Sequence, residues 1–232
     1  MITFYKQYIL YHGGHFMKKI LFQGDSITDV GRQRDLSNPF NAMGGGYPLL
    51  LRSRLYLDHP GEYECLNRGI SGNRVVDLYA RIQRDMLNIA PDYLSILIGV
   101  NDVWHGLSDD PNGVSAEKFE KVYSLLLEEI KEKLPDVKLL ILEPFVLPGS
   151  ATQAEDAPER WEIFSREVPL RAAAAKRIAE KFGAVFIPLQ EKFDAACQLM
   201  PASYWLRDGV HPTEAGHELI AREWMKAFEK MA

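Results

Sequence analysis

The sequence predicts an α/β protein built on a parallel sheet of five strands. Two observations support this class: short apolar runs alternate with segments of helical periodicity, and several of the runs are continuous rather than alternating. Continuous apolar runs are typical of parallel strands that are covered on both faces. Because helices separate the strands, the connections are expected to be right-handed crossovers.

The strands are expected where these short apolar runs occur. In chain order they cover residues 18–23, 62–67, 93–98, 138–142 and 184–187. No internal repeat, low-complexity tract or linker divides the chain between them. The sequence therefore predicts one domain over residues 17–232.

The first three helices are expected between the early strands. Two of them cover residues 47–57 and 75–88. The third starts after Ser115, whose hydroxyl is suited to cap a helix N-terminus. Its apolar residues recur at helical spacing, at Phe119, Val122, Leu126 and Ile130.

Two further helices and one long loop complete the expected elements. One helix is predicted to begin near Pro169, since proline is tolerated in a first turn, and to end at Gly183. The last helix follows Thr213. Residues 145–158 contain two prolines, directly follow a third at Pro144, and are expected to form an irregular loop beside the binding site.

Composition excludes several classes of partner. The 232 residues carry a formal net charge of −5, which gives no reason to expect nucleic acid or an anionic membrane as partner. No apolar run approaches the roughly 18 residues of a spanning helix. The two cysteines, Cys65 and Cys197, form no disulfide framework and suit a reducing compartment.

Residues 1–16 differ from the rest of the chain. They contain three tyrosines, two histidines and a Gly-Gly pair, and lack the apolar core of a secretory signal. We interpret them as an N-terminal extension, either a leader or the product of an upstream start, with Met17 as the alternative first residue.

Polar residues stand where the strands of the predicted sheet end, which is where open α/β sheets bind ligands. Ser26 follows the first strand in the run Gly-Asp-Ser, Gly72 follows the second, and Asn101 follows the third. Asp208 and His211 come just before the last helix.

These residue types suit acyl transfer through serine. Ser26 is the candidate nucleophile, His211 the base that takes its proton, and Asp208 the acid that orients the imidazole. A tetrahedral oxyanion needs donors, and we expect them from the backbone N–H groups of Ser26 and Gly72 and from the side-chain amide of Asn101.

The four blocks resemble, in order, those of the SGNH (GDSL-type) hydrolases. They are Gly24-Asp25-Ser26, Gly72, Gly99-x-Asn101-Asp102 and Asp208-x-x-His211. The resemblance implies a flavodoxin-like three-layer α/β/α sandwich, ester hydrolysis through an acyl-serine, and no metal or cofactor. It also implies that Ser26, Asp208 and His211 are catalytic.

A narrower resemblance is to the intracellular bacterial acetylxylan esterases. It rests on residues 67–73, 98–104 and 210–217. It implies an acetylated xylo-oligosaccharide as substrate, a cytoplasmic location and a homo-oligomer. Two alternatives remain: a lysophospholipase or thioesterase of the same superfamily, and a non-catalytic carbohydrate-binding protein on the same fold.

Several neighbouring residues have more than one interpretation. Trp104 and Tyr47 are candidates for contact with the substrate. Asp25 and Asp102 are expected to organise loops by accepting backbone hydrogen bonds, with Asp102 as an alternative acid. His217 is an alternative base, but its place one turn into a helix favours a structural or indirect role.

Overall fold

The computed structural model describes residues 17–35, 41–154, 157 and 159–231. The predicted N-terminal extension, residues 1–16, lies outside the described residues. Five parallel strands form one sheet in the order β2-β1-β3-β4-β5, which is the flavodoxin-like order. The strands are β1 (Lys18–Gly24), β2 (Tyr63–Asn67), β3 (Tyr93–Leu97), β4 (Lys138–Leu142) and β5 (Val185–Ile187). The predicted fold class is confirmed.

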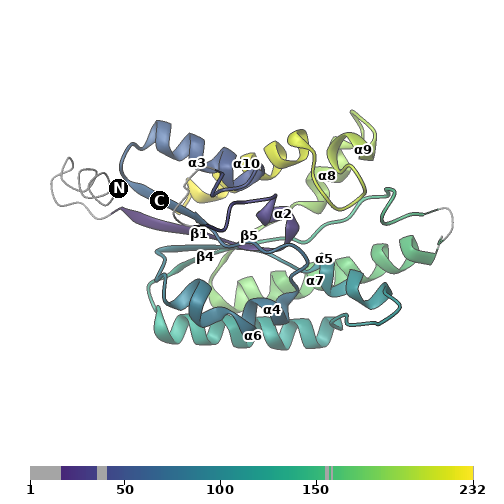
Figure 1. The fold of residues 1–232 in the computed structure, drawn as a ribbon, viewed down its shortest axis with the longest axis horizontal. Helices are drawn as coiled ribbons and strands as arrows, with labels where there is room; N and C mark the ends of the chain where they lie inside the picture. The colour runs from purple at the N-terminus through teal and green to yellow at the C-terminus, as the bar shows by residue number, and fades with distance from the viewer. Residues whose placement is uncertain (1–16, 36–40, 155–156, 158, 232) are drawn as a thin grey trace.

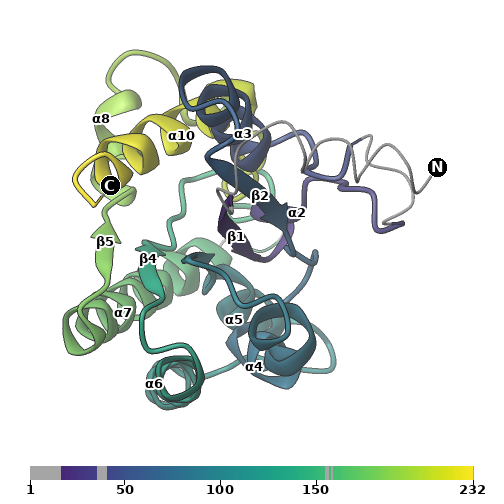
Figure 2. The same ribbon diagram turned by 90° about the vertical axis from the view of Figure 1, so that its left-hand side faces the viewer.

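Helices cover both faces of the sheet and make three layers (Figures 1 and 2). One layer contains α3 (Tyr47–Asp58), α8 (Gln190–Ala196) and α10 (Glu214–Phe228). The other contains α4 (Val75–Ala80), α6 (Ala116–Lys133) and α7 (Glu159–Phe182). The remaining short helices are α2 (Ser26–Asp29), α5 (Val100–Trp104), a 3-10 turn (His105–Leu107) and α9 (Ala202–Trp205).

Each layer has its own apolar core, because successive side chains of a strand point to opposite faces. On β1, Ile20 and Phe22 pack with Trp224 of α10, whereas Leu21 packs with the cluster that contains Leu126 of α6. All five of these side chains are fully buried. The sheet is therefore anchored from both sides, and its carboxyl edge is free to carry the polar loops.

The helix predicted over residues 75–88 is interrupted. It ends at Ala80, and a π-helical turn follows at Gln83–Leu87. The carbonyl of Asp85 accepts a buried hydrogen bond of 2.7 Å from Gln23 Nε2 on β1. Because an inserted side chain competes for a helix carbonyl, the wider turn accommodates this contact.

The predicted start near Pro169 is wrong, because α7 begins at Glu159 and Pro169 lies inside it. An internal proline costs a helix about 3 kcal/mol. Phe164, more than one turn earlier, and Val168, directly before the proline, are buried in the core. Burial of such side chains contributes about 1.5–3 kcal/mol each, which offsets the missing hydrogen bond. Ser115, in contrast, caps α6 as predicted, accepting from the Lys118 N–H.

Candidate active site

The end of β1 fixes the position of Ser26. A Cβ on Gly24 would lie 2.4 Å from the Leu97 carbonyl oxygen of the neighbouring strand, so only glycine fits at this position. Asp25 then caps α2, accepting a 2.9 Å hydrogen bond from the Ile27 N–H. Ser26 is the first residue of that short helix and is half-buried at the carboxyl edge of the sheet.

The three predicted catalytic side chains form a continuous series. Ser26 Oγ lies 2.9 Å from His211 Nε2, and His211 Nδ1 lies 2.7 Å from Asp208 Oδ2. Because an ionised carboxylate only accepts hydrogen bonds, Nδ1 carries the imidazole proton. Nε2 is then an acceptor for the Ser26 hydroxyl, which is the tautomer that a general base needs.

Asp208 is held ionised by its own turn. Its Oδ1 accepts from the Val210 and His211 N–H groups at 3.0 and 2.8 Å, and its Oδ2 faces the imidazole. Burial favours the neutral acid, but these hydrogen bonds outweigh burial and hold the pKa of Asp208 well below its ordinary value. The carboxylate is therefore charged throughout the neutral range.

The loop after β4 supports that turn. The Ala151 N–H donates to the Asp208 carbonyl at 2.9 Å, and the Leu147 N–H donates to the Gly209 carbonyl at 2.9 Å. A Cβ on Gly149 would lie 2.3 Å from the Asp208 carbonyl carbon, so only glycine allows this approach. This part of the predicted 145–158 loop thus positions the acid.

The three predicted oxyanion donors follow three neighbouring strands: Ser26 begins α2 after β1, Gly72 lies in the turn after β2, and Asn101 lies in α5 after β3. Within the described residues, neither the Ser26 nor the Gly72 N–H donates to a backbone or side-chain acceptor. Gly72 is exposed, with a φ of +82° that glycine adopts readily. Asn101 Nδ2 donates to the Asn73 carbonyl at 3.1 Å, which leaves its second N–H for a ligand.

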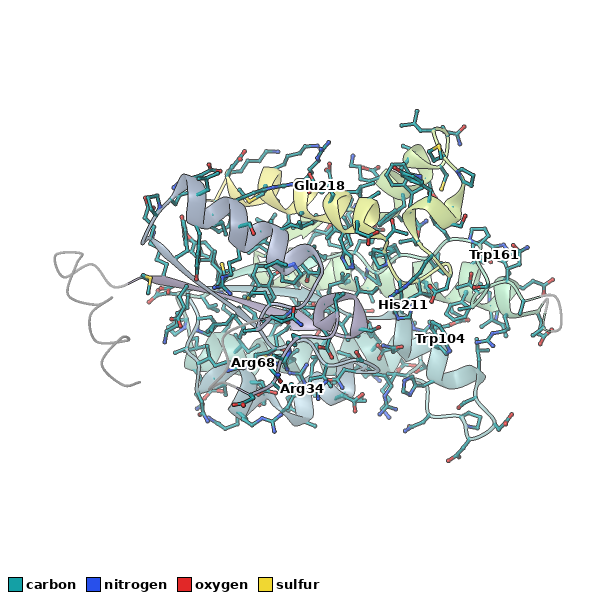
Figure 3. The ribbon with its side chains drawn as sticks, turned by 45° about the horizontal axis from the view of Figure 1, so that its top comes forward. Arg34, Arg68, Trp104, Trp161, His211 and Glu218 are labelled. Atoms are coloured by element: carbon teal, nitrogen blue, oxygen red, sulfur yellow. The ribbon has the colours of Figure 1, made fainter. Side chains whose placement is uncertain are left out.

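The two substrate-binding candidates differ in position. Trp104 is half-buried beside the base, with its ring centroid 6.1 Å from that of His211 (Figure 3). Tyr47 is 0% exposed, and its hydroxyl lies 3.0 Å from Thr28 Oγ1. Tyr47 packs in the core because its ring contacts Phe22, so the expected substrate contact of Tyr47 is wrong.

Asp25 and Asp102 organise the loops around the site, as expected. Asp102 accepts from the Val75 N–H at 3.1 Å and binds the start of α4 rather than the imidazole, so it does not take the place of Asp208. Burial raises the pKa of Asp102 to about 8 and that of Asp25 to about 7. Asp25 Oδ2 is buried without a hydrogen-bond partner among the described residues.

The raised pKa of Asp25 predicts a loss of stability as the pH rises. Its folded pKa of about 7 exceeds the ordinary value of 3.8, so folding favours the protonated form. The free energy of unfolding is therefore unaffected by Asp25 below pH 4 and falls between about pH 4 and pH 7, by a few kcal/mol in order of magnitude. Urea unfolding of wild type and Asp25→Asn across this range measures the difference, and parallel curves would contradict it.

A pocket of about 220 Å³ opens beside Ser26 and His211. Its lining includes Ser71, Arg207 and His217, of which only His217 was singled out in the sequence. Arg207 stands next to Asp208, but a lone arginine beside a motif carries no recognisable pattern. Only the folded chain brings it to the pocket.

The described residues contain no group of three or more His, Cys, Asp and Glu side chains placed to hold a metal ion. Among the same residues, no helix is both long and apolar enough to cross a membrane.

A sequence profile decides the family. The profile of the GDSL-like lipase/acylhydrolase family matches residues 22–219, which include every residue of the site described above. The chain belongs to this family. As a GDSL-like acylhydrolase, it is a carboxylic-ester hydrolase.

Relatives of known structure share the whole fold of this GDSL-like acylhydrolase. An acetylxylan esterase of Geobacillus stearothermophilus is 34% identical over 216 residues, covering 90% of this chain and 93% of that protein. The structure of that organism's acetylxylan esterase Axe2 superposes with a TM-score of 0.77 at 32% identity, over 90% of this chain and 93% of Axe2. A GDSL-like lipase from Parabacteroides merdae superposes with a TM-score of 0.83 at 39% identity, over 94% of this chain and 99% of the other.

Proposed function

We propose that this protein is a serine esterase that removes acetyl groups from a carbohydrate, such as acetylated xylo-oligosaccharides, through an acyl-serine intermediate. The observation that carries the proposal is the hydrogen-bonded series Ser26–His211–Asp208. Solved structures of Axe2 include catalytic mutants in which a serine, an aspartate or a histidine is replaced by alanine. These are the residue types found in the series.

Acylation begins with the proton of the Ser26 hydroxyl. His211 Nε2 takes this proton as Oγ forms a bond to the ester carbonyl carbon, and the carbonyl oxygen becomes an oxyanion. The tetrahedral intermediate then collapses, and the bond from carbon to the alcohol oxygen breaks. The alcohol leaves with the proton that His211 held, and the acetyl group remains on Ser26.

Deacylation repeats these steps with water as the nucleophile. His211 takes a proton from water while the water oxygen attacks the acetyl carbon. The second oxyanion then collapses, and the bond from the acetyl carbon to Ser26 Oγ breaks. The proton returns to Ser26, and acetate leaves. In both halves Asp208 stabilises the transient imidazolium, because its carboxylate stays ionised.

In this proposal the oxyanion is stabilised by three N–H donors. They are the backbone N–H groups of Ser26 and Gly72, which have no acceptor among the described residues, and the second N–H of Asn101. Each donor of this kind typically lowers the barrier by about 3–4 kcal/mol. Ser26 also stands at the N-terminal end of α2, although that helix has only four residues.

The acyl and alcohol groups are assigned from what surrounds Ser26. The half-buried ring of Trp104 offers an apolar face beside His211, which suits a short acyl chain or a sugar ring. Within the described residues the pocket beside Ser26 is small, and its lining mixes polar side chains with Ile27, Val30 and Pro212, rather than offering the extended apolar surface that a long acyl chain needs. These features favour an acetylated carbohydrate over a lysophospholipid or an acyl thioester.

A substrate series tests the proposal. We expect release of acetate from acetylated xylo-oligosaccharides and from phenyl acetate, with kcat/KM falling as the acyl chain lengthens toward palmitate. Faster turnover of long-chain esters would support a lysophospholipase or thioesterase instead. A serine-reactive fluorophosphonate should label Ser26, and failure to label the folded protein would support the non-catalytic alternative.

The proposal extends to location and assembly. We propose a cytoplasmic homo-oligomer, following the resemblance to intracellular acetylxylan esterases. Both Cys65 and Cys197 are free thiols, which suits a reducing compartment. Light scattering coupled to size-exclusion chromatography tests the assembly, and a molecular mass of 26.4 kDa would contradict it.

A further inference from the structure

His217 lies in the wall of the pocket that holds Ser26 and His211. It stands in the second turn of α10, and its ring is stacked on Tyr47 with centroids 6.4 Å apart. The residue is 5% exposed, so its position is fixed by packing. His217 is not part of the Ser26–His211–Asp208 series, since Ser26 and Asp208 each contact a ring nitrogen of His211.

One nitrogen of His217 has a fixed role. The Tyr47 N–H, at the start of α3, donates to His217 Nδ1 at 3.2 Å. An acceptor nitrogen carries no proton, so a neutral His217 must carry its proton on Nε2. Burial and the positive charge of Arg207 lower the pKa of His217 to about 4, so the ring is neutral near pH 7.

The other nitrogen is a donor without a partner. Among the described residues, no side chain or carbonyl accepts a hydrogen bond from His217 Nε2. Nε2 is not among the buried polar atoms that lack a partner in the described residues, so it is accessible from the pocket, where a ligand oxygen can accept its hydrogen bond. Arg207 lines the same pocket and forms no ion pair within the described chain, so a second donor is available there.

We propose that His217 is a specificity-determining residue, whose Nε2–H donates a hydrogen bond to a hydroxyl or ring oxygen of the sugar from which the acetyl group is removed. This inference rests on the function proposed above and assigns the pocket to the alcohol part of the ester. The assignment follows from the lining, since His217, Arg207 and Ser71 present polar groups that match a polyhydroxylated alcohol. The acetyl methyl group cannot accept hydrogen bonds from such donors.

Two substitutions at His217 separate its two nitrogens. In His217→Asn the amide oxygen reaches the place of Nδ1, so the Tyr47 N–H keeps its acceptor while the donor toward the pocket is lost. In His217→Gln the amide nitrogen reaches the place of Nε2, so the donor is kept while the Tyr47 N–H loses its acceptor. The ratio of kcat/KM for acetylated xylo-oligosaccharide to that for phenyl acetate is measured, because phenol lacks the sugar oxygens.

We expect His217→Asn to lower this ratio about tenfold, mainly through KM, as loss of one hydrogen bond to substrate predicts. His217→Gln should keep a ratio closer to that of wild type. A purely structural role predicts the reverse order: a normal ratio and melting temperature for the Asn variant, and a destabilised Gln variant. That result would overturn the inference.

Gly46→Ala provides a second route that keeps histidine at position 217 but displaces its ring. The added Cβ would lie 2.6 Å from Val30 Cγ2, 2.8 Å from His217 Cε1 and 3.0 Å from Nδ1, so both side chains must shift. The ratio should again fall, and an unchanged ratio would count against the inference. The matched control for His217→Asn is the same replacement at a remote histidine, His59→Asn. It should change the turnover of neither substrate.

The assays also separate this inference from the proposed function. If wild type hydrolyses neither acetate ester, the proposed function fails. If wild type hydrolyses both esters and His217→Asn leaves their ratio unchanged, only the assignment of His217 fails.

Discussion

Replacing Ser26 by alanine is expected to reduce kcat for acetate release by at least about 10⁴-fold, because the nucleophile is lost while the rest of the site stays in place. Ser26 Oγ has one side-chain partner among the described residues, His211 Nε2 at 2.9 Å. Removing one oxygen from a half-buried position leaves the Cβ and the Asp25 cap of α2 intact. The comparison requires purified wild type and variant under identical conditions with phenyl acetate.

Two controls make this prediction sharp. Ser53→Ala removes an exposed hydroxyl on the outer face of α3 that only donates to the Leu49 carbonyl, so its kcat should equal that of wild type. The melting temperature of Ser26→Ala should stay close to that of wild type, which excludes unfolding as the cause. Retained turnover in Ser26→Ala would show that another group attacks the ester, and the triad assignment would be wrong.

The fold could be read from the sequence because its strongest signals are local. Strand β4 was predicted with the same bounds that the structure has, and β1 differs by one residue. A continuous apolar run such as the one in β4 has few interpretations other than a buried parallel strand. Pro169 misled the prediction of α7, since helix continuation there depends on tertiary burial of Phe164.

In the active site, too, local contacts could be predicted from the sequence more readily than long-range contacts. Asp208 and His211 are three residues apart, so their pairing in one turn could be anticipated from spacing alone. Ser26 and His211 are 185 positions apart in the sequence. Their contact could be expected only because Ser26 follows the end of a strand, where α/β sheets bind ligands, and Asp208 and His211 directly precede the last helix. Tyr47 carried no signal of its burial against Phe22.

The hydrogen bonds of His217 in the pocket could not be predicted from the sequence. The role of His217 depends on which of its two nitrogens the Tyr47 N–H contacts, and that contact joins residues 170 positions apart. Hydrogen-bond direction at such distances is a property of the folded chain. The sequence favoured His211 over His217 as the base, and the structure places His211 Nε2 against Ser26 Oγ. The sequence could not show that His217 Nε2 has no partner among the described residues.

Asp208→Asn is expected to lower kcat on the order of 10⁴-fold, the size of loss known when the orienting aspartate of a serine triad becomes asparagine. The carboxylate accepts three hydrogen bonds, two from the Val210 and His211 N–H groups and one from His211 Nδ1. Asparagine has one acceptor oxygen. If that oxygen keeps the backbone contacts, the amide nitrogen faces Nδ1 and donates to it.

That reversal changes the imidazole itself. An Nδ1 that accepts carries no proton, so the proton of neutral His211 moves to Nε2, which then faces Ser26 Oγ as a donor and cannot take its proton. Nitrogen-15 NMR of labelled histidine distinguishes the two tautomers and should show His211 protonated on Nδ1 in wild type and on Nε2 in the variant. The control Asp194→Asn, at an exposed position of α8, should keep full activity. A low kcat with an unchanged tautomer would mean that Asp208 acts through its charge on the imidazolium rather than by orienting the ring.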